Sequence, residues 1–220
     1  MKRIKSLLLA GLCVLPMIKA SAFDDGDSQL WVSSSFTTSI AEKTSITISQ
    51  EFRFGDDMSD CYDVETYLGF TYKVNDAFNV AFGHLHVEVE GSDEWKSSDI
   101  PTLDFIFKQS LAGGWKIDER FRVEYYFNED AEDYDRYRFR VKLTSPWSWT
   151  SIGINPYVAV EPFYYSNSDS GFNRVRYYLG ANMKFTDHIS GNLFYLLQRD
   201  DRGSYWRDYN VLGFYLGVKF

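Results

Sequence analysis

Arginine side chains recur at every second position of several segments, and this is the pattern in the chain that most clearly suggests chemistry. The densest runs are Arg120 with Arg122 and Arg136 with Arg138 and Arg140. Guanidinium groups bind carboxylates and phosphates, and rings of basic side chains favour anion passage through pores. The candidate lumen and selectivity residues, with glutamates as counter-charges, are Arg53, Arg120, Arg122, Arg136, Arg138, Arg140, Arg174, Arg176, Glu51, Glu65, Glu124 and Glu161.

Large apolar residues occupy the positions between these charges, so one face of each segment is apolar and the other is charged. A period of two indicates a β-strand. On the lipid-facing side of a membrane barrel, each arginine near the midplane would cost about 2–4 kcal/mol, so we expect the charged face to line the lumen. Two interpretations remain open. One is a conduit for small anions, and the other is an arginine–glutamate network that fills and rigidifies a narrow lumen.

His84, His86 and Glu88 share one face of the segment Phe78–Glu90. The apolar residues of this segment change phase halfway, which predicts a β-bulge at Gly83. With that bulge, the two histidines would belong to the polar lining of the lumen. Two rings at i and i+2 lie about 7 Å apart on one side of a strand, and without further ligands they do not make a metal site. We therefore expect no metal and no cofactor.

Catalysis would require more than these histidines. A hydrolase needs a nucleophile with a histidine and a carboxylate or amide in hydrogen-bond reach. His188 lies in a predicted periplasmic turn, and neither His84 nor His86 lies in a recognisable nucleophile motif. We therefore expect no enzyme and keep an outer-membrane lipid hydrolase as the less favoured alternative.

The final segment, Leu212–Phe220, alternates apolar with small or polar residues and stops on an aromatic residue. It resembles the last strand of bacterial outer-membrane barrels, which implies the barrel-assembly machinery as a partner. Comparable alternation gives eleven segments between Gln29 and Phe220. Bacterial single-chain barrels have an even number of strands. We therefore expect an antiparallel transmembrane barrel of 12 strands, or of 10, whose first and last strands pair antiparallel.

The connections between these segments are predicted to alternate in kind, with short turns on the periplasmic side and longer acidic loops outside. Pro156 and Pro162 should sit at strand ends or bulges, because proline cannot donate to the ladder. The acidic loops could hold divalent cations that bridge to lipopolysaccharide, or could simply be solvated. The predicted long loops are Gly55–Cys61, Gly91–Ile100, Asn128–Asp133, Ser166–Gly171 and Arg199–Tyr205. Tryptophans expected in interfacial girdles are Trp31, Trp115, Trp147, Trp149 and Trp206.

The N-terminal segment Met1–Ala22 has a basic start, a short apolar run and an Ala-Ser-Ala site, and it is interpreted as a cleaved signal peptide. Residues 23–220 then form one barrel domain. Removing the four basic residues of the leader takes the formal net charge from −8 to −12, which argues against a nucleic-acid partner. Cys61 is left without a disulfide partner.

Several short motifs carry a family resemblance. They are Glu51-Phe52-Arg53-Phe54, Arg136-Tyr137-Arg138-Phe139-Arg140, Pro156-Tyr157 followed by Glu161-Pro162-Phe163, and Asn173-Arg174-Val175-Arg176. Together they resemble the recurring motifs of the bacterial outer-membrane family labelled domain of unknown function 2490. More distantly, the basic tracks resemble those of oligogalacturonate-type small porins. The family resemblance implies a barrel and adds no mechanism.

The sequence therefore predicts an all-β barrel in the bacterial outer membrane, in contact with its lipid and lipopolysaccharide. The predicted function is a narrow channel for a small anionic solute, and the alternative is a structural or surface-interaction barrel with a plugged lumen. A water-soluble sandwich or lipocalin-like barrel would also show alternation. Its single core would be overfilled by the phenylalanine, tyrosine, leucine and valine residues of eleven segments.

Overall fold

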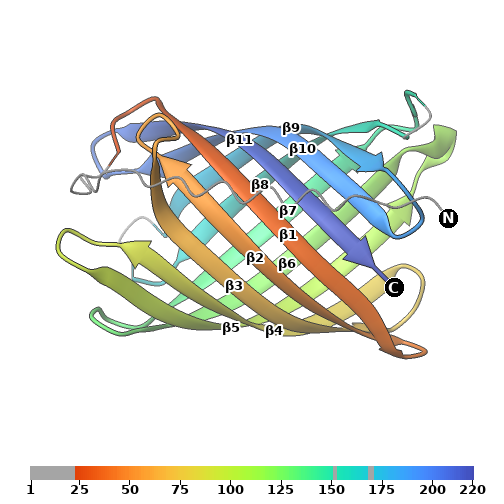
Figure 1. Ribbon diagram of the computed structural model, residues 1–220, viewed down its shortest axis with the longest axis horizontal. Coiled ribbons are helices and arrows are strands. Elements are labelled where there is room, and N and C mark those ends of the chain that lie inside the picture. Colours follow the sequence, from red (N-terminus) through yellow and green to blue (C-terminus); the bar gives the residue numbers. More distant parts are fainter. Residues whose placement is uncertain (1–22, 151–152, 168–170) are drawn as a thin grey trace, which may run out of the picture.

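The structure of the protein is a computed structural model that describes residues 23–150, 153–167 and 171–220. The predicted signal peptide, Met1–Ala22, lies outside the described residues. Within them the chain forms one closed β-barrel whose strands are strongly tilted (Figure 1). No helix in these residues is long and apolar enough to cross a membrane.

Eleven strands and a single 3₁₀ turn make up the described fold. Each strand pairs with its neighbour in sequence, and the order around the barrel is β1-β11-β10-β9-β8-β7-β6-β5-β4-β3-β2. The strands are β1 (Asp27–Ala41), β2 (Thr44–Gly55), β3 (Asp60–Lys73), β4 (Phe78–Glu90), β5 (Trp95–Ser110), β6 (Lys116–Asn128), β7 (Tyr134–Thr144), β8 (Asn155–Tyr165), β9 (Phe172–Lys184), β10 (Ile189–Asp201) and β11 (Trp206–Lys219), and the turn η1 is Ala112–Gly114.

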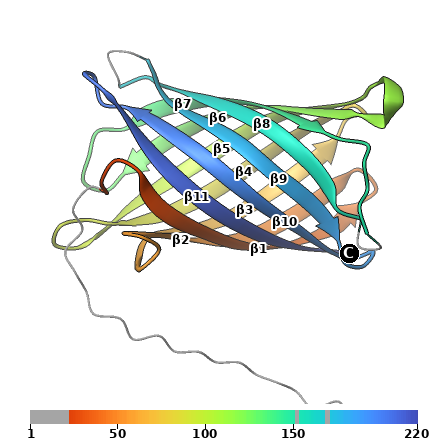
Figure 2. The ribbon, with the colours of Figure 1, turned by 90° about the horizontal axis from the view of Figure 1, so that it is seen from above.

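The barrel closes between β1 and β11, which pair parallel, whereas every other pair in the barrel is antiparallel. Figures 1 and 2 both show these two strands side by side. The register runs without a break from Asp27 opposite Tyr209 to Thr37 opposite Lys219. The expected count of 12 or 10 strands is therefore wrong. When strands alternate in direction and their number is odd, the first and the last strand run in the same direction. A parallel seam can still satisfy the backbone hydrogen bonds of both strands, as an antiparallel seam would.

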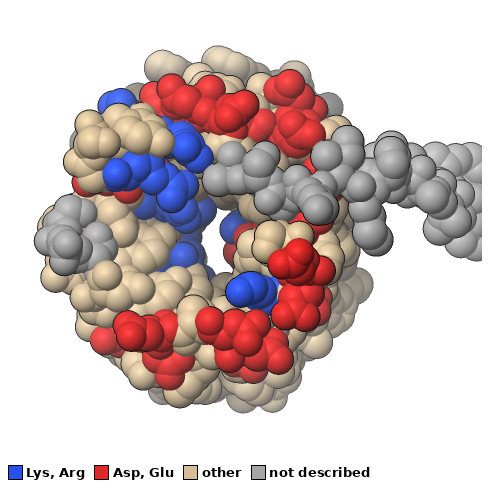
Figure 3. Space-filling model, turned by 90° about the vertical axis from the view of Figure 1, so that its left-hand side faces the viewer, with Lys and Arg blue, Asp and Glu red and all other residues tan. Residues whose placement is uncertain are grey.

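The two ends of the barrel differ in charge. We call the end at which β2 joins β3, β4 joins β5, β6 joins β7, β8 joins β9 and β10 joins β11 the acidic end, and the opposite end, which carries Phe220, the C-terminal end. Figure 3 shows acidic residues around the opening at the acidic end. The predicted difference in length is wrong, because the acidic-end connections have four to six residues and the longest connection, 145–154, lies at the C-terminal end. Strand pairing continues into the predicted loops, as far as Glu90 opposite Trp95 and Asp201 opposite Trp206.

The two faces of the wall are chemically inverted relative to a water-soluble barrel. Large apolar side chains point outward and stay exposed, such as Phe82 at 59% and Leu179 at 62% of their full accessible area. Charged side chains such as Glu124 and Glu161 point inward and are fully buried. This is the alternation expected of strands whose outer face meets an apolar medium and whose inner face meets a polar lumen.

The β-bulge predicted at Gly83 is absent from the described structure, because β4 pairs with β3 in one continuous register from Asn79 opposite Lys73 to Val89 opposite Asp63. Leu85 and Val87 therefore point into the barrel. There they are buried in one cluster with Ile100 and Tyr126. The prediction failed because it assumed that every apolar side chain must face outward, whereas the lumen of this barrel contains apolar clusters of its own.

The prolines of β8 interrupt pairing only locally. Pro156 is the second residue of the strand, as expected for a strand end. Pro162 lies at a gap in the β7–β8 ladder, between the pairs Arg138–Phe163 and Val141–Val160. Pro162 has no N–H to donate, and this is tolerated because Pro162 forms no ladder pair with β7.

Candidate functional site

The inward faces of β2, β3, β6, β7, β8 and β9 bring all of the predicted charged residues into the barrel interior. Alternation along each strand explains this placement, since Arg136, Arg138 and Arg140 are separated by the outward-facing Tyr137 and Phe139. Most of the predicted arginines are paired with carboxylates in the described structure. These contacts form two clusters and two further arginine–aspartate pairs.

The first cluster surrounds Glu124 and Glu161, whose side chains have no exposed surface. Arg138 joins the two, because its Nη1 lies 3.0 Å from Glu124 Oε1 and its Nη2 lies 3.0 Å from Glu161 Oε1. Arg136 donates a short hydrogen bond to Glu124. Arg120 Nη2 lies 2.6 Å from Glu161 Oε1. Each buried carboxylate is thus neutralised by at least two guanidinium groups, as burial of a charge requires.

Glu161 also binds a neutral donor. Tyr178 donates a hydrogen bond of 2.9 Å to its Oε2. Both oxygens of this buried carboxylate therefore have partners, which satisfies the group that would otherwise be most costly to bury.

The second cluster is centred on Arg53, which contacts three carboxylates. Its Nη2 lies 2.7 Å from Glu51 and 2.6 Å from Glu65, and its Nη1 lies 3.1 Å from Asp63. Asp63 was not among the predicted counter-charges. A register shift between β2 and β3 at Arg53 and Phe54 places Cys61 rather than Tyr62 opposite Phe54, and both Tyr62 and Asp63 contact lumen residues.

Two arginine–aspartate pairs complete the network, and the sequence interpretation missed both aspartates. The first of them adjoins the Glu124 and Glu161 cluster, because Arg122 Nη1 lies 3.7 Å from Glu124 Oε1 and Arg120 Nε lies 3.8 Å from Asp104 Oδ1. Arg122 binds Asp104 through two hydrogen bonds of 2.7 Å. Arg174 binds Asp200 through hydrogen bonds of 2.7 and 2.6 Å. Asp200 had been assigned to an acidic loop, but β10 extends to Asp201 and turns Asp200 inward. The alternation of Asp104 with Leu103 and Phe105 was a usable signal for the other aspartate.

A central cavity of about 370 Å³ lies within this network. Seven basic and two acidic side chains line it, together with tyrosine, asparagine, alanine and phenylalanine. The carboxylates that pair with several of these cations, Asp104, Glu124 and Glu161, are buried behind the cavity wall. The lining charged residues are Glu51, Arg53, Glu65, Arg120, Arg122, Arg138, Arg140, Lys142 and Arg176.

Arg140 differs from its neighbours in the cavity. Its Nε atom is buried without a hydrogen-bond partner, and within the described part of the chain its guanidinium forms no salt bridge. Lys142 is held only loosely, with its Nζ 3.8 Å from Asp118. Arg176 likewise forms no salt bridge within the described residues, and its Nε donates to the neutral Gln198 Oε1 at 2.8 Å. Arg140 and Arg176 therefore contribute the least compensated positive charge of the cavity, followed by Lys142.

Arg53 and Arg176 also line two smaller cavities, of about 230 and 290 Å³. The three cavities therefore adjoin at these two arginines. Both guanidinium groups stack on Trp31, with Cζ at 4.3 Å from the ring centroid for Arg53 and 4.7 Å for Arg176. At the acidic end the interior opens to the outside, with basic side chains visible in the opening (Figure 3).

Trp31 is not a girdle residue, as the sequence had suggested. Its side chain is only 2% exposed and packs inside the barrel with Phe194, Leu196 and Val211. The inward register of β1, with Gly213 opposite on β11, explains this position. Trp147, Trp149 and Trp206 are exposed near strand ends, as expected for girdle residues, and Trp115 packs edge-on against Trp147.

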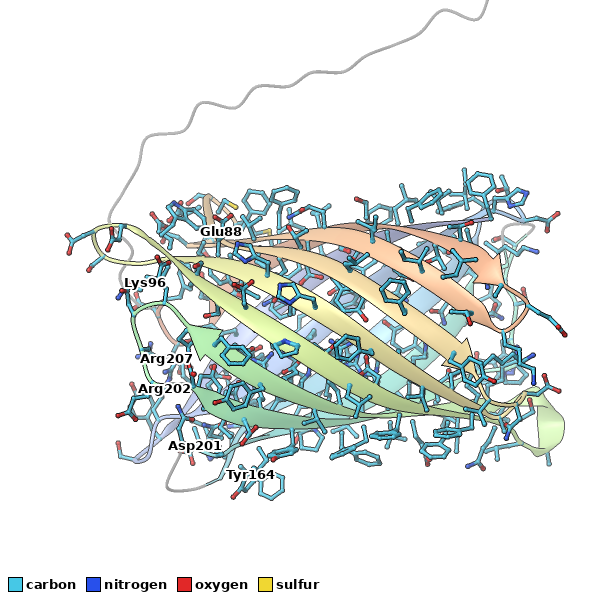
Figure 4. All side chains as sticks on the ribbon, turned by 90° about the horizontal axis from the view of Figure 1, so that it is seen from below. Glu88, Lys96, Tyr164, Asp201, Arg202 and Arg207 are labelled. Atoms are coloured by element: carbon cyan, nitrogen blue, oxygen red, sulfur yellow. The ribbon has the colours of Figure 1, made fainter. Side chains whose placement is uncertain are left out.

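His84, His86 and Glu88 do not line the lumen. Without the bulge at Gly83 they lie on the outer face of β4, and the histidine side chains are 52% and 41% exposed. Both rings contact Asp99 on β5. Figure 4 shows Glu88 toward the acidic end of the barrel. Among the described residues, no group of three histidine, cysteine, aspartate or glutamate side chains could hold a metal ion.

Fold and interior together define a closed β-barrel with an apolar outer wall and an arginine-rich lumen. Residues 28–209 match the family described as Protein of unknown function (DUF2490), a range that extends from β1 into β11. The chain belongs to this family. No curated protein matches the chain.

Proposed function

We propose that the protein is an integral β-barrel of the bacterial outer membrane. The observation that carries this proposal is the inverted wall, with a band of exposed phenylalanine, tyrosine, leucine and valine outside and buried ion pairs inside. A contiguous apolar surface of this kind needs a lipid environment or a partner that covers it all round. In this placement the acidic end faces outward and Phe220 lies on the periplasmic side.

We further propose that the lumen passes small anions. The excess of guanidinium and ammonium groups at the wall of the central cavity supports this proposal, because their counter-charges are buried behind them. A wall with this arrangement attracts anions and repels cations. The three adjoining cavities give such a solute a succession of sites along the lumen.

A barrel with a plugged lumen is the second candidate, and a specific observation favours it. Arg138 bridges two buried carboxylates across the interior, and apolar clusters around Trp31 and Ile100 occupy further space. Such a network would rigidify the wall without conducting. A hydrolase within the lumen is disfavoured, because His84 and His86 lie on the outer face and His188 lies in the turn 185–188 at the C-terminal end.

Planar-bilayer recording of the purified full-length protein tests these proposals. The wild type should give stable open-channel current with a reversal potential that shows anion preference. Arg140→Ser should lower the anion-to-cation permeability ratio by up to about thirtyfold, because a unit positive charge about 4 Å away favours an anion and disfavours a cation by about 1 kcal/mol each, even at the dielectric constant of water. Arg140 is the right residue to change because its removal leaves no buried carboxylate without a partner.

The matched control is Arg199→Ser. Arg199 lies on the outer face of β10 and pairs with the half-buried Asp208, so its loss should leave the permeability ratio unchanged. Absence of current in the wild type would favour the plugged barrel. A permeability ratio that stays constant in Arg140→Ser, or changes equally in Arg199→Ser, would contradict the role of the basic cavity wall.

A further inference from the structure

Two pairs of arginines are directly opposite one another on the inward faces of β6 and β7. The inward-facing pairs of this ladder are Glu124 with Arg136, Arg122 with Arg138, Arg120 with Arg140, and Asp118 with Lys142. Opposite charges therefore meet at both ends of the series, whereas arginine meets arginine at its two middle positions. Directly opposite side chains have Cβ atoms about 4.5–5.5 Å apart, and like charges in this arrangement repel each other. An anion that contacts both guanidinium groups would offset this repulsion.

The pair formed by Arg122 and Arg138 has such an anion within the protein. Glu124 Oε1 lies 3.0 Å from Arg138 Nη1 and 3.7 Å from Arg122 Nη1. One buried carboxylate oxygen thus contacts both guanidinium groups, as burial of these charges requires.

The pair formed by Arg120 and Arg140 has no bridging carboxylate in the described part of the chain. Glu161 Oε1 contacts Arg120 at 2.6 Å but lies 3.0 Å from Arg138 as well, and the other oxygen of Glu161 accepts a hydrogen bond from Tyr178. Arg140 forms no salt bridge there, and the Nε atoms of both arginines are buried without a hydrogen-bond partner. The side chains of the barrel therefore leave this second pair without a shared anion.

The charges in this part of the wall do not balance. The six cations of the series are Arg120, Arg122, Arg136, Arg138, Arg140 and Lys142, and the carboxylates that form salt bridges with them in the described ranges are Asp104, Asp118, Glu124 and Glu161. Two positive charges are therefore left without a counter-charge. Lys142 adds N–H donors beside Arg140, because its Nζ lies 3.8 Å from Asp118 and is too far away for a hydrogen bond.

Neutral polar side chains of β8, β9 and β10 line the same cavity. Lys142 Nζ lies 5.3 Å from the ring centroid of Tyr157, so the basic and neutral parts of the lining adjoin. Tyr157 donates a hydrogen bond to Asn192 Oδ1, and Asn192 Nδ2 donates one to Asn182 Oδ1, each of 3.0 Å. The Nδ2 of Asn182 donates no hydrogen bond to the described residues. It is a further donor for a solute in the cavity.

We infer that the central cavity binds a phosphate group at Arg120, Arg140 and Lys142, either as inorganic phosphate or as the phosphate monoester of a small solute. A phosphate carries a charge of about −1.5 to −2 at pH 7, which matches the two uncompensated cations, whereas a carboxylate supplies only one charge. Guanidinium forks also bind phosphate oxygens in pairs. The volume of about 370 Å³ is within the range of about 300–1,000 Å³ of small-molecule sites. The inference rests on the proposed access of anions to the lumen, and it names the class of solute.

Isothermal titration calorimetry of the purified full-length protein in a neutral detergent measures this binding directly. Inorganic phosphate, glycerol phosphate and acetate are titrated at equal ionic strength and at about pH 8, where phosphate is a dianion. The wild type should bind one phosphate per chain at least about tenfold more tightly than acetate, as expected for additional charge-assisted hydrogen bonds. Tighter binding of inorganic phosphate or of glycerol phosphate identifies the source of the phosphate group.

Variants of Arg140 test the position of the site. Arg140→Ser should weaken phosphate binding at least about tenfold, because it removes one charged donor group. Arg140→Lys should weaken binding less, because it keeps the charge and loses only the fork. Heat-modifiable migration on a gel shows that each variant is folded.

Arg199→Ser is the matched control, because it removes the same charge from the outer face of β10. It should leave the affinity for phosphate unchanged. Failure of the wild type to bind phosphate, equal affinities for acetate and phosphate, or an undiminished affinity in Arg140→Ser would overturn the inference. Bilayer recording separates the two proposals. Phosphate binding without channel current supports the site and contradicts the conduit, whereas an anion-selective current without phosphate binding contradicts only the site.

Discussion

Replacing Arg138 should destabilise the barrel far more than replacing Arg140, although the two residues are neighbours on the same face of β7. Arg138→Ser removes the guanidinium that contacts both Glu124 and Glu161. Neither carboxylate has any exposed surface, so water cannot replace the lost partner. Arg140→Ser removes a group that pairs with no carboxylate in the described part of the chain.

The expected magnitude follows from what each carboxylate retains. Removing one partner of a buried ion pair costs about 3–5 kcal/mol, because the other charge stays buried. Glu124 keeps Arg136, and Glu161 keeps Arg120 and Tyr178. We therefore expect Arg138→Ser to lie at the lower end of that range, at about 3 kcal/mol. For Arg140→Ser the change in the free energy of unfolding should stay below about 1 kcal/mol.

Urea titration of the protein reconstituted in lipid vesicles measures the difference. Folding can be followed through tryptophan fluorescence and through heat-modifiable migration on a gel. With a slope of about 2 kcal/mol per molar, a loss of 3 kcal/mol moves the unfolding midpoint by about 1.5 M. Glu161→Gln combined with Arg138→Ser should recover part of the loss, because one unpaired charge is removed. Equal midpoints for Arg138→Ser and Arg140→Ser would refute the assignment of Arg138 as the bridge between buried charges.

Two further predictions concern the ends and the seam of the barrel. In a Cys61→Ser background, the pair Ser34→Cys and Leu216→Cys should form a disulfide on oxidation, because the two residues are opposite one another in the parallel seam. The pair Ser34→Cys and Leu212→Cys should not, because Leu212 lies about 13 Å along the strand from Leu216. The reverse result would contradict the parallel register. Hydrogen bonds from Lys73 to Asp76 and from Lys184 to Asp187 hold the pKa values of these two aspartates below the ordinary value. Any contribution of these ion pairs to the stability of the fold is therefore present above the ordinary pKa of aspartate. It disappears as the pH falls through the lowered pKa. Because both aspartates are fully exposed, Asp76→Asn should leave the urea midpoint at pH 7 unchanged, and a clear shift would contradict this.

Periodicity predicted the strands and the inward direction of the arginines, because both depend on local alternation. β7 shows this directly, with Arg136, Arg138 and Arg140 on one face and exposed Phe139 on the other. Glu124 and Glu161 were likewise placed correctly as counter-charges. Local alternation does not reveal which arginine meets which carboxylate. That pairing depends on the register between strands. Asp63 lies on the same face as Glu65, but only the register that places it opposite Arg53 makes it a counter-charge.

The way the barrel closes and the inward side of β4 were both predicted wrongly from the sequence, for different reasons. The strand count of the alternating segments was correct, but the rule of even parity was applied to it, and the parallel seam removes the need for that rule. For β4, the assumption of an entirely polar lumen led to a bulge that would have turned His84 and His86 inward. The contacts of Leu85 with Ile100 and Tyr126 come from three strands and become visible only in three dimensions.

The parallel seam and the charged lumen constrain each other through Trp31. This residue is opposite Gly213 across the seam, and its ring supports Arg53 of β2 and Arg176 of β9. A slip of one residue between β1 and its neighbours would turn Trp31 outward and bring Val32 into the lumen. Both guanidinium groups would then lose their stacking partner at the point where the three cavities adjoin. The register of the closing strands is therefore specified by the same contacts that shape the proposed anion path, so substitutions at Trp31 should affect closure and selectivity together.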